Sequence, residues 1–353
     1  MVRKLDHDEI FNLLKRLETH CADVRRVLKL QAEKEAMRKE AAARVTMNVE
    51  AYSRIAVWRE IGREIWGSLR LGGYFDYDRA IYLKLAQIIA LTSSLKYRYG
   101  ILKNARTVIE GRSGIGKTTY AMLSLYGAFR ILGLDRDSSW SLAISLTFMD
   151  SVDFAEFMYK AIKNEVYIPA IILDEAGLAL SKYWIWGSRE LKRAMASLLE
   201  VFDQIKDWTG VLILTTPTLE NVAKRLRDIC DYRIQGDEFP TCDEDVVELY
   251  TVWVIKRRVL HFYEVYSYPH RSVIKRAKLE EEPIDVDVMP STIKLPEQYW
   301  KIHTGERRER ALERLSLYLK TIEMIQRKEE EEWIKTAENA PEVEENVEES
   351  GEE

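Results

Sequence analysis

The chain has 353 residues, enough for one catalytic domain with smaller appended segments, and 46% of them are hydrophobic, enough for a sizeable core. No apolar stretch reaches about 18 residues, and the charged start of the chain lacks a signal-peptide core, so we expect no membrane span and a cytoplasmic location. The three cysteines are far apart and form no C-x-x-C pair, which indicates neither a disulfide framework nor a zinc site.

The formal net charge of −5 is distributed unevenly along the chain. From Glu329 onward, twelve glutamates stand against one lysine, so this end carries −11 and residues 1–328 carry +6. A segment of such composition cannot bury enough apolar surface to fold, and we expect residues 336–353 to be a disordered acidic tail. The alternative is that the tail occupies a basic nucleic-acid groove of the same chain.

The first 75 residues are expected to be helical. Apolar residues recur at helical spacing between charged positions from 5 to about 45, which predicts one long helix. A second helix is expected over 51–69. A third, over 76–97, begins at the acidic residues Asp76 and Asp78 and leads into the catalytic domain.

Residues 111–118, Gly-Arg-Ser-Gly-Ile-Gly-Lys-Thr, match the phosphate-loop pattern G-x-x-x-x-G-K-[ST] without a mismatch. A short apolar run over 107–110 predicts a strand before the loop, and 119–132 predicts a helix after it, which is the context that the motif requires. Glycines let successive N–H groups point around a polyphosphate, and the helix N-terminus adds partial positive charge. The expected nucleotide-binding residues are Gly111, Arg112, Ser113, Gly114, Ile115, Gly116, Lys117, Thr118 and Thr119.

Two side chains of this loop have expected chemical roles. Lys117 would reach the β- and γ-phosphates of a nucleotide, and the Thr118 hydroxyl would bind Mg²⁺. The absence of the GTPase base-recognition motif N-K-x-D favours ATP over GTP. A glycine-rich turn that contains Lys-Thr by chance is the alternative interpretation.

Strands and helices alternate after the loop, which predicts an α/β fold with a parallel sheet covered by helices on both faces. The expected elements are strands at 141–148, 170–175, 211–214 and 232–234 and helices at 152–164, 189–208 and 219–229.

The strand at 170–175 ends in two carboxylates, where a buried parallel strand would meet the nucleotide. Asp174 is placed to hold the Mg²⁺ shell, and Glu175 is the candidate base that polarises the attacking water. A core strand that ends in a solvated acidic turn is the alternative. The strand at 211–214 ends in Thr215 and Thr216, where a hydroxyl could orient the water or sense the γ-phosphate, or could cap the following helix.

The strand inserted between the phosphate loop and the acidic strand, with Glu175 beside Asp174, resembles the additional-strand, catalytic-glutamate (ASCE) division of phosphate-loop ATPases. That division includes the AAA+, RecA-like and FtsK/HerA families. The resemblance covers roughly residues 105–235 and implies a P-loop NTPase sandwich that hydrolyses ATP with Mg²⁺.

Beyond residue 236, Val246–Ile255 and Val259–Tyr266 predict a β-hairpin with a basic tip at Lys256, Arg257 and Arg258. AAA+ proteins ordinarily place a helical lid here. A strand pair is more similar to the FtsK/HerA group, zonular-occludens-toxin-like phage ATPases and viral packaging motors. Those proteins usually end the third motif strand in Gln, where this chain has threonines, so the family stays open. The chain also resembles the ATPases carried by archaeal viruses and plasmids.

Pro283, Pro290 and Pro296 predict an extended linker before a final charged helix. The expected organisation is an N-terminal helical region at 1–75, a P-loop ATPase domain at 76–236, a hairpin and linker appendage at 237–300, a charged helix at 301–335 and the acidic tail at 336–353.

Two arginines near the end of the helix at 219–229 are candidates for an arginine finger. In ring-forming relatives this location faces the neighbouring subunit, where a guanidinium stabilises charge on the γ-phosphate. Arg227 is the first candidate and Arg225 the second, and either role implies a homo-oligomer. The alternative is a surface helix with positive charge at its C-terminal end.

Basic residues after the ATPase domain suggest DNA contact. The residues at the hairpin tip are followed by Arg271, Lys275, Arg276 and Lys278, and aromatic residues lie nearby in the sequence, a combination that suits phosphate contact with stacking. Solvated surface charge is the alternative. The favoured function is an oligomeric, DNA-directed ATPase motor for translocation or packaging. The other candidates are an AAA+-type replication initiator or loader switch and a secretion or assembly ATPase that does not act on DNA.

Overall fold

The computed structural model describes residues 3–46, 53–67, 75–176, 204–218, 230–240, 246–254, 283–290 and 293–338, with residue 220 and a few residues between 193 and 202. The chain forms two compact units, Met1–Trp300 and Lys301–Glu353. The first contains the sheet, and the second contains most of helix α13 (Glu297–Glu338). In the described part of the chain, no helix is long and apolar enough to cross a membrane.

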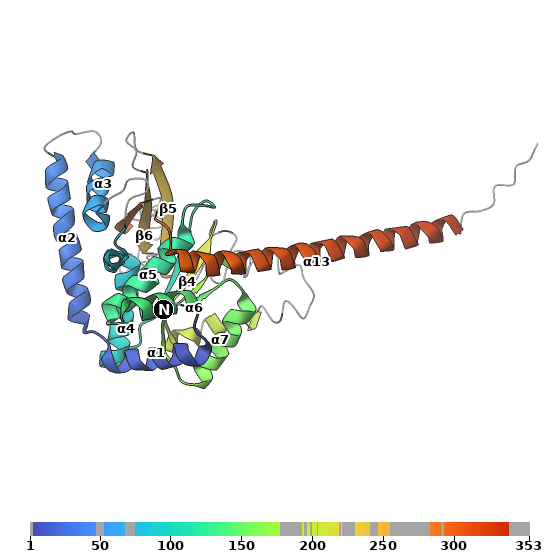
Figure 1. Ribbon diagram of the computed structural model, residues 1–353, viewed down its shortest axis with the longest axis horizontal. Helices are drawn as coiled ribbons and strands as arrows, with labels where there is room; N and C mark the ends of the chain where they lie inside the picture. The colour runs from blue at the N-terminus through green and yellow to red at the C-terminus, as the bar shows by residue number, and fades with distance from the viewer. Residues whose placement is uncertain are drawn as a thin grey trace, which may run out of the picture. The chain divides into compact units, whose positions relative to one another are not determined.

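A single seven-stranded sheet forms the core of the first unit (Figure 1). Its order is β2-β3-β4-β1-β5-β6-β7, with the first five strands parallel and β6 and β7 each antiparallel to the strand before it. The strands are β1 (Ala105–Glu110), β2 (Thr147–Phe148), β3 (Ile168–Leu173), β4 (Thr209–Thr216), β5 (Tyr232–Pro240), β6 (Val246–Val254) and β7 (Pro283–Pro290). The predicted α/β fold with a central parallel sheet is confirmed.

Strand β4, predicted at 211–214, lies between β1 and β3. Strand β2, the extended part of the strand expected at 141–148, lies instead at the edge of the sheet beside β3. Val211 of β4 is in register with Ala105 of β1 on one side and with Ala170 of β3 on the other. At the other end of the strands, Thr216 is level with Glu110, the residue before the loop. The carboxyl ends of β1, β3 and β4 therefore meet at one edge of the sheet, where ligands of open α/β sheets bind.

Helix α5 (Lys117–Leu132), which follows the loop, is central to the fold. From Tyr120 to Leu132 every residue except Arg130 is buried, so the helix is apolar nearly all round. It packs against the sheet, against α4 (Lys84–Tyr99) and against the 3₁₀ helix η1 (Tyr77–Tyr82). Among the residues that the structure describes, the first unit also contains α1 (His7–His20), α2 (Val24–Thr46), α3 (Ser53–Trp66), α6 (Arg136–Ser145), α7 (Ser151–Lys163) and the short 3₁₀ helix η3 (Ile205–Asp207).

The predicted single helix over residues 5–45 is wrong, because the chain breaks between α1 and α2. The break is held by contacts to distant residues. The Ala22 N–H donates to the Leu132 carbonyl (3.1 Å), and the Ser94 hydroxyl donates to the Ala22 carbonyl (3.1 Å). At this break, hydrogen bonds to residues of α4 and α5 replace the intrahelical hydrogen bonds, and no local sequence pattern predicts them.

The predicted strand at 141–148 is also mostly helical, since α6 runs to Ser145 and only β2 is extended. Asp135 caps the helix by accepting a hydrogen bond from the Ser138 N–H (2.9 Å). All residues from 139 to 149 are buried, so the apolar pattern carries no period that would separate a helix from a strand.

The predicted proline-marked linker is partly wrong, because its first eight residues form the edge strand β7. Proline lacks a backbone donor, and an edge strand tolerates it. In the antiparallel part of the sheet, β6 pairs with β5 and β7. The expected partner strand at 259–266 lies outside the described residues, together with the basic tip, nearly all of the expected helix at 219–229 and residues 339–353 of the expected tail. The first three residues of that tail, 336–338, belong to helix α13.

Candidate functional site

The loop between β1 and α5 passes close to β5 at its first glycine. Gly111 has a φ of +150°, and a Cβ at this position would lie 2.8 Å from the Gly236 carbonyl oxygen and 3.2 Å from Ile115 Cγ2. Any side chain here would push β5 away from the loop. The requirement for glycine therefore comes from packing as well as from backbone conformation.

The Lys117 side chain turns back over the start of the loop. Its ammonium group donates hydrogen bonds to the carbonyl oxygens of Gly111 (2.7 Å) and Arg112 (2.8 Å). These contacts place a positive charge within the loop, at the N-terminal end of α5, whose own partial charge has the same sign. This arrangement of charges favours an anion at the loop, and the role of the loop as a binding site stays a prediction.

A chain of hydrogen bonds joins the loop helix to the ends of β3 and β4. The Thr118 hydroxyl donates to Asp174 Oδ1 (2.8 Å), and the Thr215 hydroxyl donates to the same oxygen (2.5 Å). The Thr215 oxygen also accepts from the Glu175 N–H (3.0 Å). Asp174 is 1% exposed, so these contacts lie in a dry environment where each hydrogen bond constrains the carboxylate strongly.

Glu175 has an uncommon backbone conformation, with a φ of +52°. A non-glycine residue in the left-handed region costs on the order of 1–3 kcal/mol, and such residues cluster at functional sites. The turn places Glu175 directly after the buried Asp174 and leaves its side chain half-buried. Glu165 has the same φ of +52° in the turn before β3, so it is the sequence motif together with the contact to Thr215 that distinguishes Glu175.

A cavity of about 440 Å³ lies beside the loop, between the ends of β4 and β5. Arg233 of β5 reaches into it and forms an ion pair with Glu110, the last residue of β1 (2.5 Å from Nη2 to Oε1). Neither residue has a local signal in the sequence. Arg233 is in register with Val108, and only this pairing of β5 with β1 brings the two charges together at the loop.

The predicted site residues fall into three groups. Residues 111–119 form the loop and the first turn of α5, and the loop lies next to Asp174 and Thr215. The Thr216 hydroxyl instead donates to the Thr218 carbonyl (2.9 Å), so its role at the site stays a prediction. Arg225 and Arg227 lie outside the described residues, and their role as a finger also stays a prediction.

The chain is similar to two viral proteins. It is 32% identical over 121 residues to the uncharacterized protein B-251 of Sulfolobus spindle-shape virus 1, an overlap that covers 34% of this chain and 46% of that protein. It is 25% identical over 237 residues to the uncharacterized protein ORF286 of Acidianus two-tailed virus, covering 64% and 73%. The chain thus spans less than half the length of B-251. No protein-family model matches it.

Two solved structures overlap with part of the chain. The flagellar accessory protein FlaH of Methanocaldococcus jannaschii covers 46% of this chain and 84% of its own, with 17% identity and a TM-score of 0.28. A KaiC-like protein of Pyrococcus horikoshii OT3 covers 44% and 81%, with 13% identity and a TM-score of 0.29. At TM-scores this low, neither structure supports a conclusion about function, which rests instead on the strand order and the site geometry of this chain.

Proposed function

We propose that this chain is a Mg²⁺-dependent ATPase that works as a homo-oligomer on DNA. One observation carries the ATPase proposal. The phosphate loop lies at the same sheet edge as Asp174 and Thr215, and the Thr118 hydroxyl is hydrogen-bonded to Asp174 (2.8 Å). A glycine-rich turn that matched the motif by chance would have no reason to place its threonine within hydrogen-bonding distance of a buried aspartate at the end of another strand.

The residues at this edge fit a magnesium ion. The Thr118 hydroxyl and the Asp174 carboxylate are adjacent oxygen donors, the ligand type that Mg²⁺ prefers, and the loop provides the charge for the phosphates. These two residues would hold the ion, which supplies neutralisation of charge on the β- and γ-phosphates.

The side chains around the loop suit the remaining tasks of hydrolysis. Lys117 would exchange its loop carbonyls for phosphate oxygens, because a charged acceptor binds an ammonium group more strongly than a neutral one. Glu175 would accept a proton from the attacking water, and Thr215 fixes the backbone on which Glu175 sits. Arg227 or Arg225 of a neighbouring subunit would then stabilise charge on the γ-phosphate.

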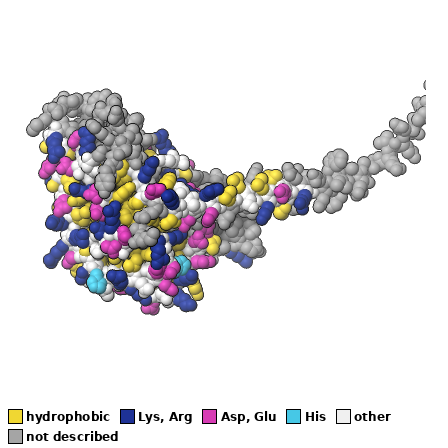
Figure 2. Space-filling view, viewed as in Figure 1, with side chains coloured by type: hydrophobic (Ala, Val, Ile, Leu, Met, Phe, Trp, Pro, Cys, Tyr) yellow, Lys and Arg dark blue, Asp and Glu magenta, His cyan; other side chains and the backbone are white. Residues whose placement is uncertain are grey.

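The proposed action on DNA is supported by the sequence between β6 and β7. Figure 2 shows basic and acidic side chains mixed over the described part of one face, a pattern that offers no continuous track for a phosphate backbone there. The concentrated basic residues are those at 256–258 and 271–278, which lie outside the described residues. We assign DNA contact to this connection because its basic residues are close together in the sequence.

One assay on purified protein tests both parts of the proposal. Phosphate release from Mg-ATP is measured for the wild type and for Lys117→Ala, without DNA and with double-stranded DNA of increasing length. We expect turnover in the wild type only, with stimulation that grows with DNA length. Stimulation independent of length would indicate a loader switch, and no stimulation would indicate an assembly ATPase. Full turnover by Lys117→Ala would exclude the loop as the site.

A further inference from the structure

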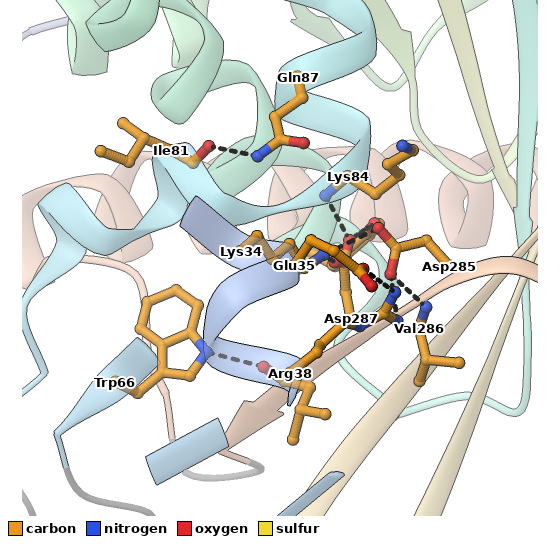
Figure 3. Close-up of polar contacts among 12 residues, drawn as sticks. Lys34, Glu35, Arg38, Trp66, Ile81, Lys84, Gln87, Asp285, Val286 and Asp287 are labelled. Atoms are coloured by element: carbon orange, nitrogen blue, oxygen red, sulfur yellow. Dashed lines mark hydrogen bonds and ion pairs between the residues drawn. The ribbon is translucent and has the colours of Figure 1, made fainter. Parts of the chain in front are cut away.

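A buried cluster of charged residues joins the C-terminal strand of the sheet to the N-terminal helices (Figure 3). Asp285 and Asp287 of β7 face Lys34 of α2, whose ammonium group lies 3.1 Å from Asp285 Oδ2 and 2.5 Å from Asp287 Oδ1. Arg38 of α2 forms a further ion pair with Asp285 (2.5 Å). Two cations thus neutralise two carboxylates that are less than 10% exposed.

Asp287 is bonded to three different helices at once. Besides Lys34 of α2, its Oδ2 accepts hydrogen bonds from the Lys84 N–H of α4 (2.7 Å) and from the Tyr120 hydroxyl of α5 (2.7 Å). Helix α4 has no side-chain cap of its own, so Asp287 satisfies a helix N-terminus from more than 200 residues away in the chain. A buried carboxylate held by three donors has little freedom to move.

The contact with Tyr120 is made one turn into the phosphate-loop helix. Tyr120 follows Lys117 by three residues and Thr118 by two. Its hydrogen bond to Asp287 therefore fixes the position of the first turn of α5 relative to β7. Farther along, α5 is fixed again where Gly127 packs against the Ala80 carbonyl so closely that a Cβ would overlap it. The helix is therefore held at two points along its length.

The sheet provides a second link between Asp287 and the loop. Asp287 is in register with Tyr250 of β6, and Tyr250 is in register with Gly236 of β5. Gly236 is the residue whose carbonyl packs against Gly111 at the start of the loop. Asp287 thus reaches the first glycine of the loop across two strands and the helix after the loop through Tyr120.

We propose that Tyr120 and Asp287 are positioning residues for the phosphate loop, an inference that rests on the proposed ATPase activity. The cluster on β7 holds the first turn of α5 so that Lys117 and Thr118 meet the phosphates in the reactive geometry. The strand at 283–290 is accordingly part of the catalytic unit and not an appendage to it. Small displacements of such groups reduce turnover strongly, since catalysis depends on their orientation in the transition state.

The test compares two tyrosines on the same helix. Tyr120→Phe removes the hydroxyl that bonds the buried Asp287, and Tyr126→Phe removes a hydroxyl that bonds the more exposed Asp78, farther from the loop. Both tyrosines are fully buried, and Tyr126 keeps its ring stacking on Trp140 after the change. We expect kcat for ATP to fall about tenfold in Tyr120→Phe and to stay within about twofold of wild type in Tyr126→Phe, at temperatures where both are folded.

A second variant removes the same hydrogen bond from the side of Asp287. Asp287→Leu combined with Lys34→Met removes both charges of the buried ion pair together, while the Lys84 N–H and the Tyr120 hydroxyl lose their acceptor, so kcat is measured at temperatures where the variant is folded. We expect the folded double variant to show the lowered kcat of Tyr120→Phe. Wild-type kcat in the double variant, or equal kcat in the two tyrosine variants, would overturn this inference and leave the proposed function intact. A wild-type protein without ATP turnover would overturn the proposed function and this inference with it.

Discussion

At the end of β4, the Thr215 hydroxyl contacts both acidic residues of the candidate site. It donates to the Asp174 carboxylate and accepts from the Glu175 N–H, so one side chain orients the expected magnesium ligand and the expected base. Neighbouring Thr216 is equally buried, but its hydroxyl donates to a backbone carbonyl. The pair offers a matched comparison of two adjacent threonines.

We expect Thr215→Val to lower kcat for ATP by about tenfold or more, because Asp174 and Glu175 both lose a fixed contact. Thr216→Val removes the same hydroxyl one residue later and should cost clearly less. Steady-state hydrolysis and Mg-ATP affinity of both variants, with thermal unfolding to compare stability, are the measurements. A larger loss of kcat in Thr216→Val would transfer the role to that residue.

The position of the loop between β1 and α5, and the strand ends beside it, could be predicted because their signal is local. Eight consecutive residues carry the motif, and Asp174 and Thr215 each end an apolar run. Tyr120 and Asp287 had no such signal, since they meet across 167 residues of chain. A tyrosine in an apolar helix has the pattern of a core residue, and only the pairing of β6 with β7 brings Asp287 to it.

At the scale of elements, helix α1 is docked on α7 through a histidine. The His7 ring lies 5.4 Å from the Phe157 ring, and its Nδ1 lies 3.0 Å from Lys160 Nζ. Burial and the charge of Lys160 lower the pKa of His7, while Asp6, Asp8 and Glu156 act in the opposite direction. The folded protein therefore binds a proton at His7 less readily than the unfolded chain does.

This shift predicts a pH dependence of stability. A histidine with a lowered folded pKa contributes stability above the unfolded value of about 6.5, and this contribution is lost as pH falls below that value. We expect the thermal midpoint to decline from about pH 7 to about pH 5.5. His7→Phe should reduce the slope while keeping an aromatic ring beside Phe157, and Lys160→Met should reduce it in part. An identical slope in all three proteins would contradict the assignment.

The elements that sequence patterns missed have two physical causes. The Cys21–Asp23 break and the strand β7 are fixed by contacts with distant parts of the fold, whereas helix α6 has a local cap but is buried on all sides, so its apolar pattern has no helical period. The parallel strands β1, β3 and β4 could be predicted, because burial on both faces gives short continuous apolar runs.

At the scale of the whole molecule, the proposed assembly would make the active site composite. Lys117 and Glu175 would belong to the subunit that holds ATP, whereas Arg227 would act on the nucleotide of its neighbour. In a ring of head-to-tail contacts, every site then combines residues of two chains. Mixtures of two inactive variants can therefore distinguish an arginine that acts in trans from one that acts within its own subunit.

We expect Arg227→Ala and Glu175→Gln each to bind ATP and to be inactive alone. When they are mixed in equal amounts, about one quarter of the interfaces pair an intact Glu175 with an intact Arg227, so a comparable share of wild-type hydrolysis should return. A mixture of Lys117→Ala with Glu175→Gln is the control, because both changes damage the same half of the site and no intact site can form. Activity that stays absent in the first mixture, but returns when Arg225→Ala replaces Arg227→Ala, would identify Arg225 as the residue that acts across the interface.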